Sequence, residues 1–339
     1  MSALSRRGFV RKAGTAGVAA SLGSLSTVGC SSAAPEPCAA ASGCNVCLSG
    51  TWRFRLDPKG EGESKGWHLA RIPADGWTEV RVPHTWQVSP DLSGYMGVAW
   101  YCKDFEAPAS WAVNAVRLEF EAVYHSATVW LNGKPVGEHL RKGYTAFMLD
   151  ISSAVCPGEK NTLMVKVDNS FDMKMLPRGS SFDWAVDGGI TRPVNLLITC
   201  ETFIERVDID TRPDIENARA GLDIKVALQN GAGAAVKASV NYRVIEEDTG
   251  CTVLEQREAA EVNLEPGEAR KVTLSAATLN NPRLWHFDHP YLYRLEVEIE
   301  CRGKPLHKFS TIFGVRKIEV REGGFYLNGE RVWLMGVER

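Results

Sequence analysis

The stretch that decides the fold is Ala115-Val116-Arg117-Leu118-Glu119-Phe120-Glu121, with Ala127-Thr128-Val129-Trp130-Leu131-Asn132-Gly133 close behind it. In the first run, apolar side chains alternate with charged ones, which is the period of a strand with one buried face. The second run is apolar and ends in Asn-Gly. This pair is the strongest short-range hairpin signal, because both turn positions need φ > 0. The two runs predict antiparallel β-structure joined by tight turns.

Runs of the same kind occur along the rest of the chain. They cover residues 52–56, 163–167, 194–198, 222–228, 238–245, 261–264, 272–274 and 293–299. Gly, Pro and Asn separate them, as expected of turns. This spacing favours an all-β sandwich or jelly roll over a helical or βαβ fold.

A change of composition after Cys200 indicates two sandwiches. Residues 171–189 form a loop rich in Trp, Phe and Asp, whereas residues 207–300 show plain alternation. Seven or so short strands in about a hundred residues are typical of an immunoglobulin-like sandwich. We therefore predict a jelly-roll domain over residues 48–200 and an immunoglobulin-like domain over residues 201–318.

The last residues predict the start of a further domain. Asn328-Gly329 is expected to form a hairpin turn, after which the apolar run of residues 332–337 is expected to be a buried strand. A buried strand needs partners for its backbone groups. We expect residues 319–339 to begin a domain that continues beyond this chain.

Composition is that of a soluble globular protein. Of the 339 residues, 44% are hydrophobic and 24% are charged, and the formal net charge is −2. This charge gives no indication of nucleic-acid binding or of broad electrostatic attachment to membranes. The ten Trp residues suit a sugar-binding site, but we expect most of them in the core.

The N-terminus reads as an export signal. Arg6-Arg7 lies in a near-complete twin-arginine pattern, and a weakly apolar stretch follows over residues 13–29. Thr27-Val28-Gly29-Cys30 resembles a lipoprotein processing box, with Cys30 as the lipidated residue. The alternative is a plain export peptide with a coincidental cysteine. We expect a signal peptide over residues 1–30, a tether over residues 31–47, and a bacterial cell-envelope lipoprotein on the periplasmic or cell-surface side.

Cys44 and Cys47 have CxxC spacing, which is found in zinc sites and redox disulfides. No second CxxC or His pair lies nearby to complete four zinc ligands. We expect thiols close to the tether, able to form one local disulfide after export, with no metal and no cofactor.

Several motifs in order resemble the front half of family 2 glycoside hydrolases, the relatives of β-galactosidase, β-glucuronidase and β-mannosidase. The motifs are VPHTW (82–86), GVAWYCKDF (97–105), FEAVYHSATVWLNG (120–133), GYTAF (143–147), DGGITRPV (187–194), NPRLW (281–285), PYLY (290–293), FGVRKI (313–318) and LNG (327–329). Each motif alone is weak, but the ordered set is specific and covers residues 48–339.

The resemblance implies a sugar-binding-like jelly roll, an immunoglobulin-like domain and then a (β/α)8 barrel. Only the start of that barrel would be present, as a C-terminal stub. In this retaining family, two Glu at the open end of the barrel perform the hydrolysis, and both would lie downstream of this chain. We therefore expect carbohydrate as the partner, a β-glycoside or oligosaccharide, but no catalytic residue here and no activity of the chain alone.

The jelly roll can still contribute to a sugar site. In some relatives an acidic residue before a Trp reaches the barrel mouth, and Asp183 fits that position, with Asp187 as the second candidate. The alternative is that Asp183 caps a turn. His84 and His125 also lie in family motifs, and we expect them to pack and brace loops rather than contact substrate.

One departure concerns the chain end. Relatives commonly continue as Gly-Val-Asn-Arg-His, whereas this chain reads Gly336-Val337-Glu338-Arg339. Because Glu338 replaces the Asn of these relatives, the substrate can differ from their galactosides and glucuronides.

Two other classes of function remain open from the sequence. One is a stand-alone, surface-anchored carbohydrate-binding lipoprotein without enzymatic activity, which suits the anchor and the Trp content. The other is a periplasmic assembly or scaffold protein, but nothing specific in residues 207–300 supports it. The coding sequence beyond residue 339 would distinguish both from a hydrolase.

Overall fold

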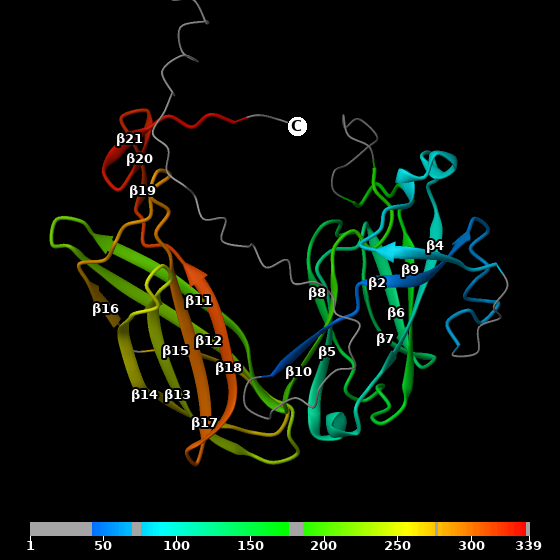
Figure 1. Ribbon diagram of the computed structural model, residues 1–339, viewed down its shortest axis with the longest axis horizontal. Helices are drawn as coiled ribbons and strands as arrows, with labels where there is room; N and C mark the ends of the chain where they lie inside the picture. The colour runs from blue at the N-terminus through cyan, green and yellow to red at the C-terminus, as the bar shows by residue number, and fades with distance from the viewer. Residues whose placement is uncertain (1–42, 70–75, 176–185, 275–276, 337–339) are drawn as a thin grey trace, which may run out of the picture. The chain divides into compact units, whose positions relative to one another are not determined.

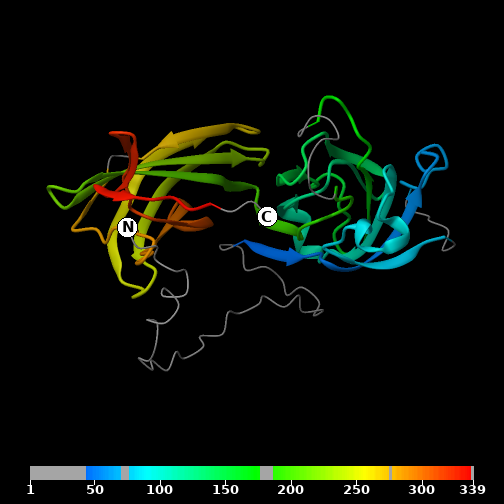
Figure 2. The same cartoon turned by 90° about the horizontal axis from the view of Figure 1, so that it is seen from above.

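In the computed structural model, the described residues are 43–69, 76–175, 186–274 and 277–336, and they form an all-β chain (Figure 1). Three short 3-10 helices, η1 (Trp86–Val88), η2 (Pro90–Leu92) and η3 (Ala109–Val113), are its only helices in that part. A view turned by 90° shows the same strands (Figure 2). No helix in the described ranges is long and apolar enough to cross a bilayer. The predicted signal residues Arg6, Arg7 and Cys30 and the candidate Asp183 lie outside the described residues.

The first sandwich consists of two antiparallel sheets. A six-stranded sheet has the order β3-β2-β4-β9-β6-β7, and a four-stranded sheet has the order β1-β10-β5-β8. The strands are β1 (Cys44–Cys47), β2 (Gly50–Asp57), β3 (Thr78–Val82), β4 (Val98–Glu106), β5 (Asn114–Phe120), β6 (Ser126–Leu131), β7 (Lys134–His139), β8 (Phe147–Asp150), β9 (Lys160–Asp168) and β10 (Val194–Cys200).

The deciding stretch of sequence folds as predicted. Residues 115–120 lie in β5, where Val116, Leu118 and Phe120 are fully buried in the core between the sheets. The second run forms β6, which pairs with β7 across a turn at Asn132 and Gly133. Their φ values of 52° and 79° are the positive values that the Asn-Gly pair predicted.

A second apolar cluster covers the outer face of the six-stranded sheet. It contains Trp67, Trp100, Trp130, Cys102 and Met164. The rings of Trp100 and Trp130 stack at 5.3 Å, and Trp67 meets Trp100 edge-on at 6.0 Å. Because both faces of β4 are therefore covered, its first residues are buried without alternation.

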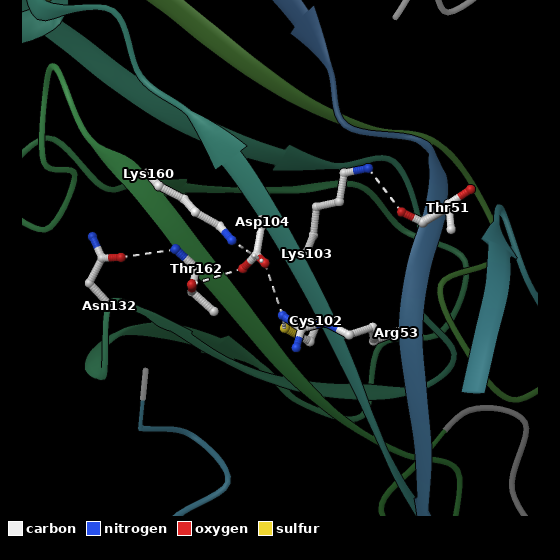
Figure 3. A network of polar contacts seen from close by, with 8 residues as sticks. All are labelled: Thr51, Arg53, Cys102, Lys103, Asp104, Asn132, Lys160 and Thr162. Atoms are coloured by element: carbon white, nitrogen blue, oxygen red, sulfur yellow. Dashed lines mark hydrogen bonds and ion pairs between the residues drawn. The ribbon is translucent and has the colours of Figure 1, made fainter. Parts of the chain in front are cut away.

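Polar side chains on the same sheet join its strands (Figure 3). The Asp104 carboxylate accepts hydrogen bonds from Thr162 Oγ1 at 2.9 Å and Arg53 Nη2 at 3.1 Å, and Lys160 Nζ lies at 3.0 Å. Burial raises the pKa of Asp104, but its partners outweigh burial and lower that pKa overall. Burial raises the pKa of the neighbouring Cys102 thiol to about 12, which keeps it protonated.

The second sandwich also has two antiparallel sheets. One has the order β11-β12-β15, with β16 paired to β12, and the other has the order β14-β13-β17-β18. The strands are β11 (Thr202–Asp214), β12 (Arg219–Asn230), β13 (Val236–Glu246), β14 (Thr252–Leu264), β15 (Ala269–Thr273), β16 (Ala277–Asn280), β17 (Tyr293–Cys301) and β18 (Lys304–Phe313). The core between the sheets is aliphatic, with Ile224, Val226, Val240, Leu295 and Val297 fully or almost fully buried.

The last described residues form a small antiparallel sheet of β19 (Ile318–Arg321), β20 (Gly324–Leu327) and β21 (Glu330–Val332). The predicted turn at Asn328-Gly329 is confirmed, with φ values of 54° and 87°.

The predicted buried strand over residues 332–337 is wrong for the residues described, because β21 ends at Val332. Trp333, Leu334 and Met335 are 80%, 60% and 98% exposed, and residues 333–336 pair with no strand in the described ranges. Without a neighbouring strand, the backbone of this apolar run has no ladder to join. The expected barrel stub is accordingly not evident in the described part of the chain.

Candidate functional site

The candidate Asp187 lies in the segment that leads into β10, and two hydrogen bonds hold it there. Tyr144 donates its hydroxyl proton to Asp187 Oδ2 over 2.6 Å, and Asn169 Nδ2 donates to the Asp187 carbonyl oxygen over 3.1 Å. Burial raises the pKa of Tyr144, and the Asp187 carboxylate raises it further. The phenol therefore remains a proton donor at neutral pH, and the contact braces the loop.

Two glycines after Asp187 bring this segment close to the core. A Cβ atom on Gly188 would lie 2.2 Å from ring atoms of Trp86. Gly189 has a φ of 139°, and a Cβ atom there would lie 2.4 Å from the His84 carbonyl oxygen. Only glycine allows this approach. It places Gly189 where its backbone exchanges hydrogen bonds of 2.9 and 3.2 Å with Tyr124.

His84 behaves as the sequence predicted. Its Nδ1 lies 2.7 Å from the Tyr101 hydroxyl, and its ring meets Phe54 edge-on. Burial lowers the pKa of His84, so that the ring is neutral at physiological pH. A neutral, packed imidazole beside a buried tyrosine braces the loop between β3 and β4.

His125 is only partly explained by bracing. Its Nδ1 lies 2.9 Å from the carbonyl oxygen of Asp168, which fixes the ring between β6 and the end of β9. The residue is 3% exposed. Its Nε2 has no hydrogen-bond partner among the described residues.

Buried carboxylates in the described ranges serve structure rather than acid–base chemistry. Asp57 accepts hydrogen bonds from the backbone N–H groups of Glu61 and Gly62 and from the Trp100 indole, all within 3.0 Å. Glu296 binds Arg243 and Lys308. Burial raises the pKa of Glu296, but the two cations lower it overall. Both carboxylates are hydrogen-bond or ion-pair acceptors within the fold.

The sequence analysis identified Asp187 but missed its partners. Tyr144 lies in the GYTAF motif, which contributed only to the family resemblance. Nothing in the sequence marked Asn169 as a neighbour of Asp187. The positive φ of Tyr144, 62°, shows how sharply that loop turns. Asp183, the first candidate, lies outside the described residues, so its role stays a prediction.

Two family models match consecutive parts of the chain. The model of the sugar binding domain of glycosyl hydrolases family 2 matches residues 46–200. The model named glycosyl hydrolases family 2 matches residues 202–316. Both belong to the same family, and together they cover most of the chain.

Curated relatives agree with this assignment. The chain is 29% identical over 311 residues to a β-glucuronidase of Paenibacillus borealis, covering 85% of this chain and 48% of that protein. It is 31% identical over 266 residues to a β-galactosidase of Thermoanaerobacter pseudethanolicus, covering 77% of this chain and 34% of that protein. The chain thus spans about a third to a half of the relatives' lengths.

Solved structures show the same architecture. A putative β-galactosidase from Bacteroides fragilis superposes with a TM-score of 0.74 at 29% identity, over 86% of this chain and 44% of that one. A Bacteroides uniformis β-glucuronidase gives a TM-score of 0.76 at 26% identity, over 85% of this chain and 34% of that one. With both family models and the structural neighbours in agreement, the chain belongs to family 2 of the glycosyl hydrolases.

Proposed function

We propose that this chain is the noncatalytic N-terminal part of an exported glycoside hydrolase that cleaves O-glycosidic bonds of β-glycosides. In this proposal a (β/α)8 barrel follows the second sandwich and supplies two Glu for a retaining mechanism. The partner is a carbohydrate, a β-glycoside or oligosaccharide.

The observation that carries the proposal is the match of two consecutive family-2 models to residues 46–316. The relatives named β-glucuronidase and β-galactosidase are about two to three times longer than the matched part. Which sugar the whole protein would accept does not follow from these names, because relatives of both kinds match equally well.

The described residues fit a supporting role. Retaining hydrolysis needs two carboxyl groups about 5–5.5 Å apart, one as nucleophile and one as acid. The buried carboxylates Asp57 and Glu296 belong to different sandwiches, and each already contacts two or more donors. The cations beside Glu296 lower its pKa, which makes it a poor proton donor at neutral pH.

The experiment compares the 339-residue chain with its gene product extended through the downstream reading frame. Both are assayed on a panel of aryl β-glucosides, β-galactosides, β-mannosides and β-glucuronides. We expect turnover by the extended protein only. A matched control is the extended protein with its barrel Glu pair changed to Gln, which should be inactive while keeping its Tm.

Turnover by the short chain at a rate comparable to the extended protein would contradict the proposal. A stop codon directly after residue 339 in the native gene would also contradict it. That outcome would favour a binding module over part of a hydrolase.

A further inference from the structure

The small sheet of β19, β20 and β21 has one apolar face and one polar face. Successive side chains of a strand point to opposite faces, and directly paired residues share a face. The register pairs Ile318 with Leu327 and Val320 with Phe325, and Phe325 pairs in turn with Val332. These five side chains lie on one face, which we call the terminal apolar face. The opposite face carries the polar side chains of Glu319, Arg321, Tyr326 and Arg331.

Most of the terminal apolar face is open to water. Ile318, Val320 and Phe325 are 64%, 73% and 46% exposed, whereas Leu327 is 2% exposed. The exposure of the first three side chains means that no described residue covers that end of the face. Contiguous apolar surface on a soluble protein commonly marks a site of interaction with another protein surface.

Hydrogen bonds hold this sheet on the second sandwich. The Asn328 N–H donates to the Lys317 carbonyl oxygen over 2.8 Å, and Asn328 Oδ1 accepts the Lys317 N–H over 3.0 Å. Asn328 Nδ2 donates to the carbonyl oxygen of Trp285, in the segment between β16 and β17, over 2.9 Å. The terminal apolar face is therefore already ordered, which reduces the entropy that docking would cost.

The apolar surface continues from the small sheet onto the second sandwich at a groove of about 640 Å³. Ile318 of the terminal apolar face and Ile312 of β18 both line this groove, and Ile312 is 55% exposed. Asp208, Asp210 and Arg316 line it as well. An apolar strip with charged groups beside it has the anatomy of a protein interface, in which an apolar centre is surrounded by a polar rim.

The residues after β21 and the length of the relatives favour one occupant for this face. Residues 333–336 lead away from β21 (Figure 1), and Trp333, Leu334 and Met335 are 80%, 60% and 98% exposed. Two of the matched relatives are longer proteins, of which this chain covers 48% and 34%. A domain that follows this chain in a longer protein is tethered a few residues from β21. Its effective concentration at the face therefore far exceeds that of a second copy in dilute solution.

We propose that the terminal apolar face is the docking surface for the (β/α)8 barrel that the proposed function places after this chain. Val320 and Phe325 are buried there against an apolar surface of the barrel. The inference rests on the proposed function, but it concerns the assembly of the domains and not hydrolysis. The centre of such an interface is apolar and depleted of charge, so a charged side chain at Val320 would prevent close docking.

The test compares Val320→Lys with Val253→Lys, each in the 339-residue chain and in the extended protein. Val253→Lys is the matched control, because Val253 is also an exposed strand valine, 44% exposed on β14. In the 339-residue chain both replacements lie in water, so each should change the Tm by less than about 1 °C. In the extended protein Val320→Lys should lower the Tm by at least about 4 °C, and Val253→Lys by less than about 1 °C.

Val320→Thr is a milder variant, because it keeps the shape of valine and adds only a hydroxyl group. It should lower the Tm of the extended protein by less than Val320→Lys does, and it decides the question if the lysine variant fails to fold. Sedimentation velocity is measured in parallel. Val320→Lys should leave the oligomeric state of the extended protein unchanged, because the face contacts the barrel of its own chain.

An extended protein whose Tm is the same with and without the Val320 replacements would overturn the proposal. Dissociation of an oligomer of the extended protein by Val320→Lys would also overturn it, because that result would assign the face to a second copy. An extended protein without glycosidase activity that is destabilised by Val320→Lys would refute the proposed function and keep this inference. An active extended protein that is indifferent to Val320→Lys would do the reverse, so the two proposals fail separately.

Discussion

Single residues decide how the loop before β10 is held. Gly188 and Gly189 let the backbone touch Trp86 and His84, and the hydroxyl of Tyr144 then reaches Asp187. Asp187 thus has a structural partner on this chain. An acidic residue that binds sugar hydroxyls should instead have carboxylate oxygens available when the substrate arrives. We therefore expect Asp187 to brace the loop, while contact of Asp183 with substrate stays a prediction because Asp183 lies outside the described residues.

Asp183→Ala in the extended protein should lower kcat/KM at least about 10-fold with little change in Tm. Charge-assisted hydrogen bonds to sugar hydroxyls are each worth about 1.5–3 kcal/mol when water is excluded, and such exclusion needs the barrel wall. The measurement is steady-state kinetics on the best aryl glycoside, with thermal unfolding in parallel.

Asp187→Ala is the matched control for that variant. It removes the acceptor of the partly exposed Tyr144, so it should cost about 1 kcal/mol of stability or less and affect kcat/KM weakly. Full activity of Asp183→Ala would assign Asp183 to turn capping. Loss of activity by Asp187→Ala alone would reverse the two roles.

At the scale of elements, the sequence predicted strands from short or alternating apolar runs that turn residues separate. β12 alternates in sequence and in burial, and the predicted runs from residue 52 to residue 299 lie in strands except for the last residues of two runs, at positions 121 and 274. β4 was missed as a strand because tryptophans cover its outer face, so its apolar residues run without alternation. β11 was missed because its C-terminal half is largely exposed and polar.

The candidate site was less predictable than the strands. Asp187 meets Tyr144 and Asn169 through hydrogen bonds that span 43 and 18 residues of sequence. Such contacts depend on how three loops approach one another in the fold. The alternation of apolar and polar residues along a strand carries no information about the positions of loops. The apolar run after Val332 was mistaken for a buried strand for a related reason, since hydrophobicity alone does not supply a pairing partner.

A side-chain hydrogen bond between β18 and β11, which belong to different sheets, predicts a dependence of stability on pH. His307 on β18 is 6% exposed, and its Nδ1 accepts the backbone N–H of Ile204 on β11 over 3.0 Å. Burial lowers the pKa of His307 to about 4 from 6.5. Between these two pH values the unfolded chain binds a proton that the folded chain does not, so stability falls as the pH falls.

The full contribution of His307 is present above pH 6.5 and is lost on acidification to about pH 4, a loss of about 3 kcal/mol. His307→Gln should remove this part of the pH dependence. Urea unfolding at pH 7 and pH 4.5 gives the change in unfolding free energy for the unmodified chain and for His307→Gln. The difference between these two changes is the contribution of His307, because the carboxylates titrate in both proteins and cancel. His289→Gln, at an exposed histidine, is the control. An identical pH dependence of His307→Gln and the unmodified chain would contradict the assignment.

At the scale of the whole molecule, the N-terminal residues and the two sandwiches suggest different roles. Two sandwiches with separate cores occupy the span that both family models match. The residues before them carry no strand pattern, but they include Arg6-Arg7 in a near-complete twin-arginine pattern, and Cys30. The twin-arginine route exports folded proteins, which suits a long protein with several domains. We propose that the protein is a cell-envelope lipoprotein, in which an acyl anchor and a tether of residues 31–47 hold the sandwiches near a membrane surface.

Replacing Arg6 and Arg7 by Lys should block export, and Cys30→Ala should release the exported protein from membranes. The physical reason is that the formal net charge of −2 provides little electrostatic attraction to anionic lipid, so acyl chains must supply the attachment. Cell fractionation and labelling with a radioactive fatty acid measure both effects, and Cys47→Ala is the matched cysteine control, which should keep label and membrane association. Unchanged membrane association of Cys30→Ala would refute the anchor. Export of the double Lys variant at the normal level would refute the twin-arginine route while leaving the anchor to the labelling result.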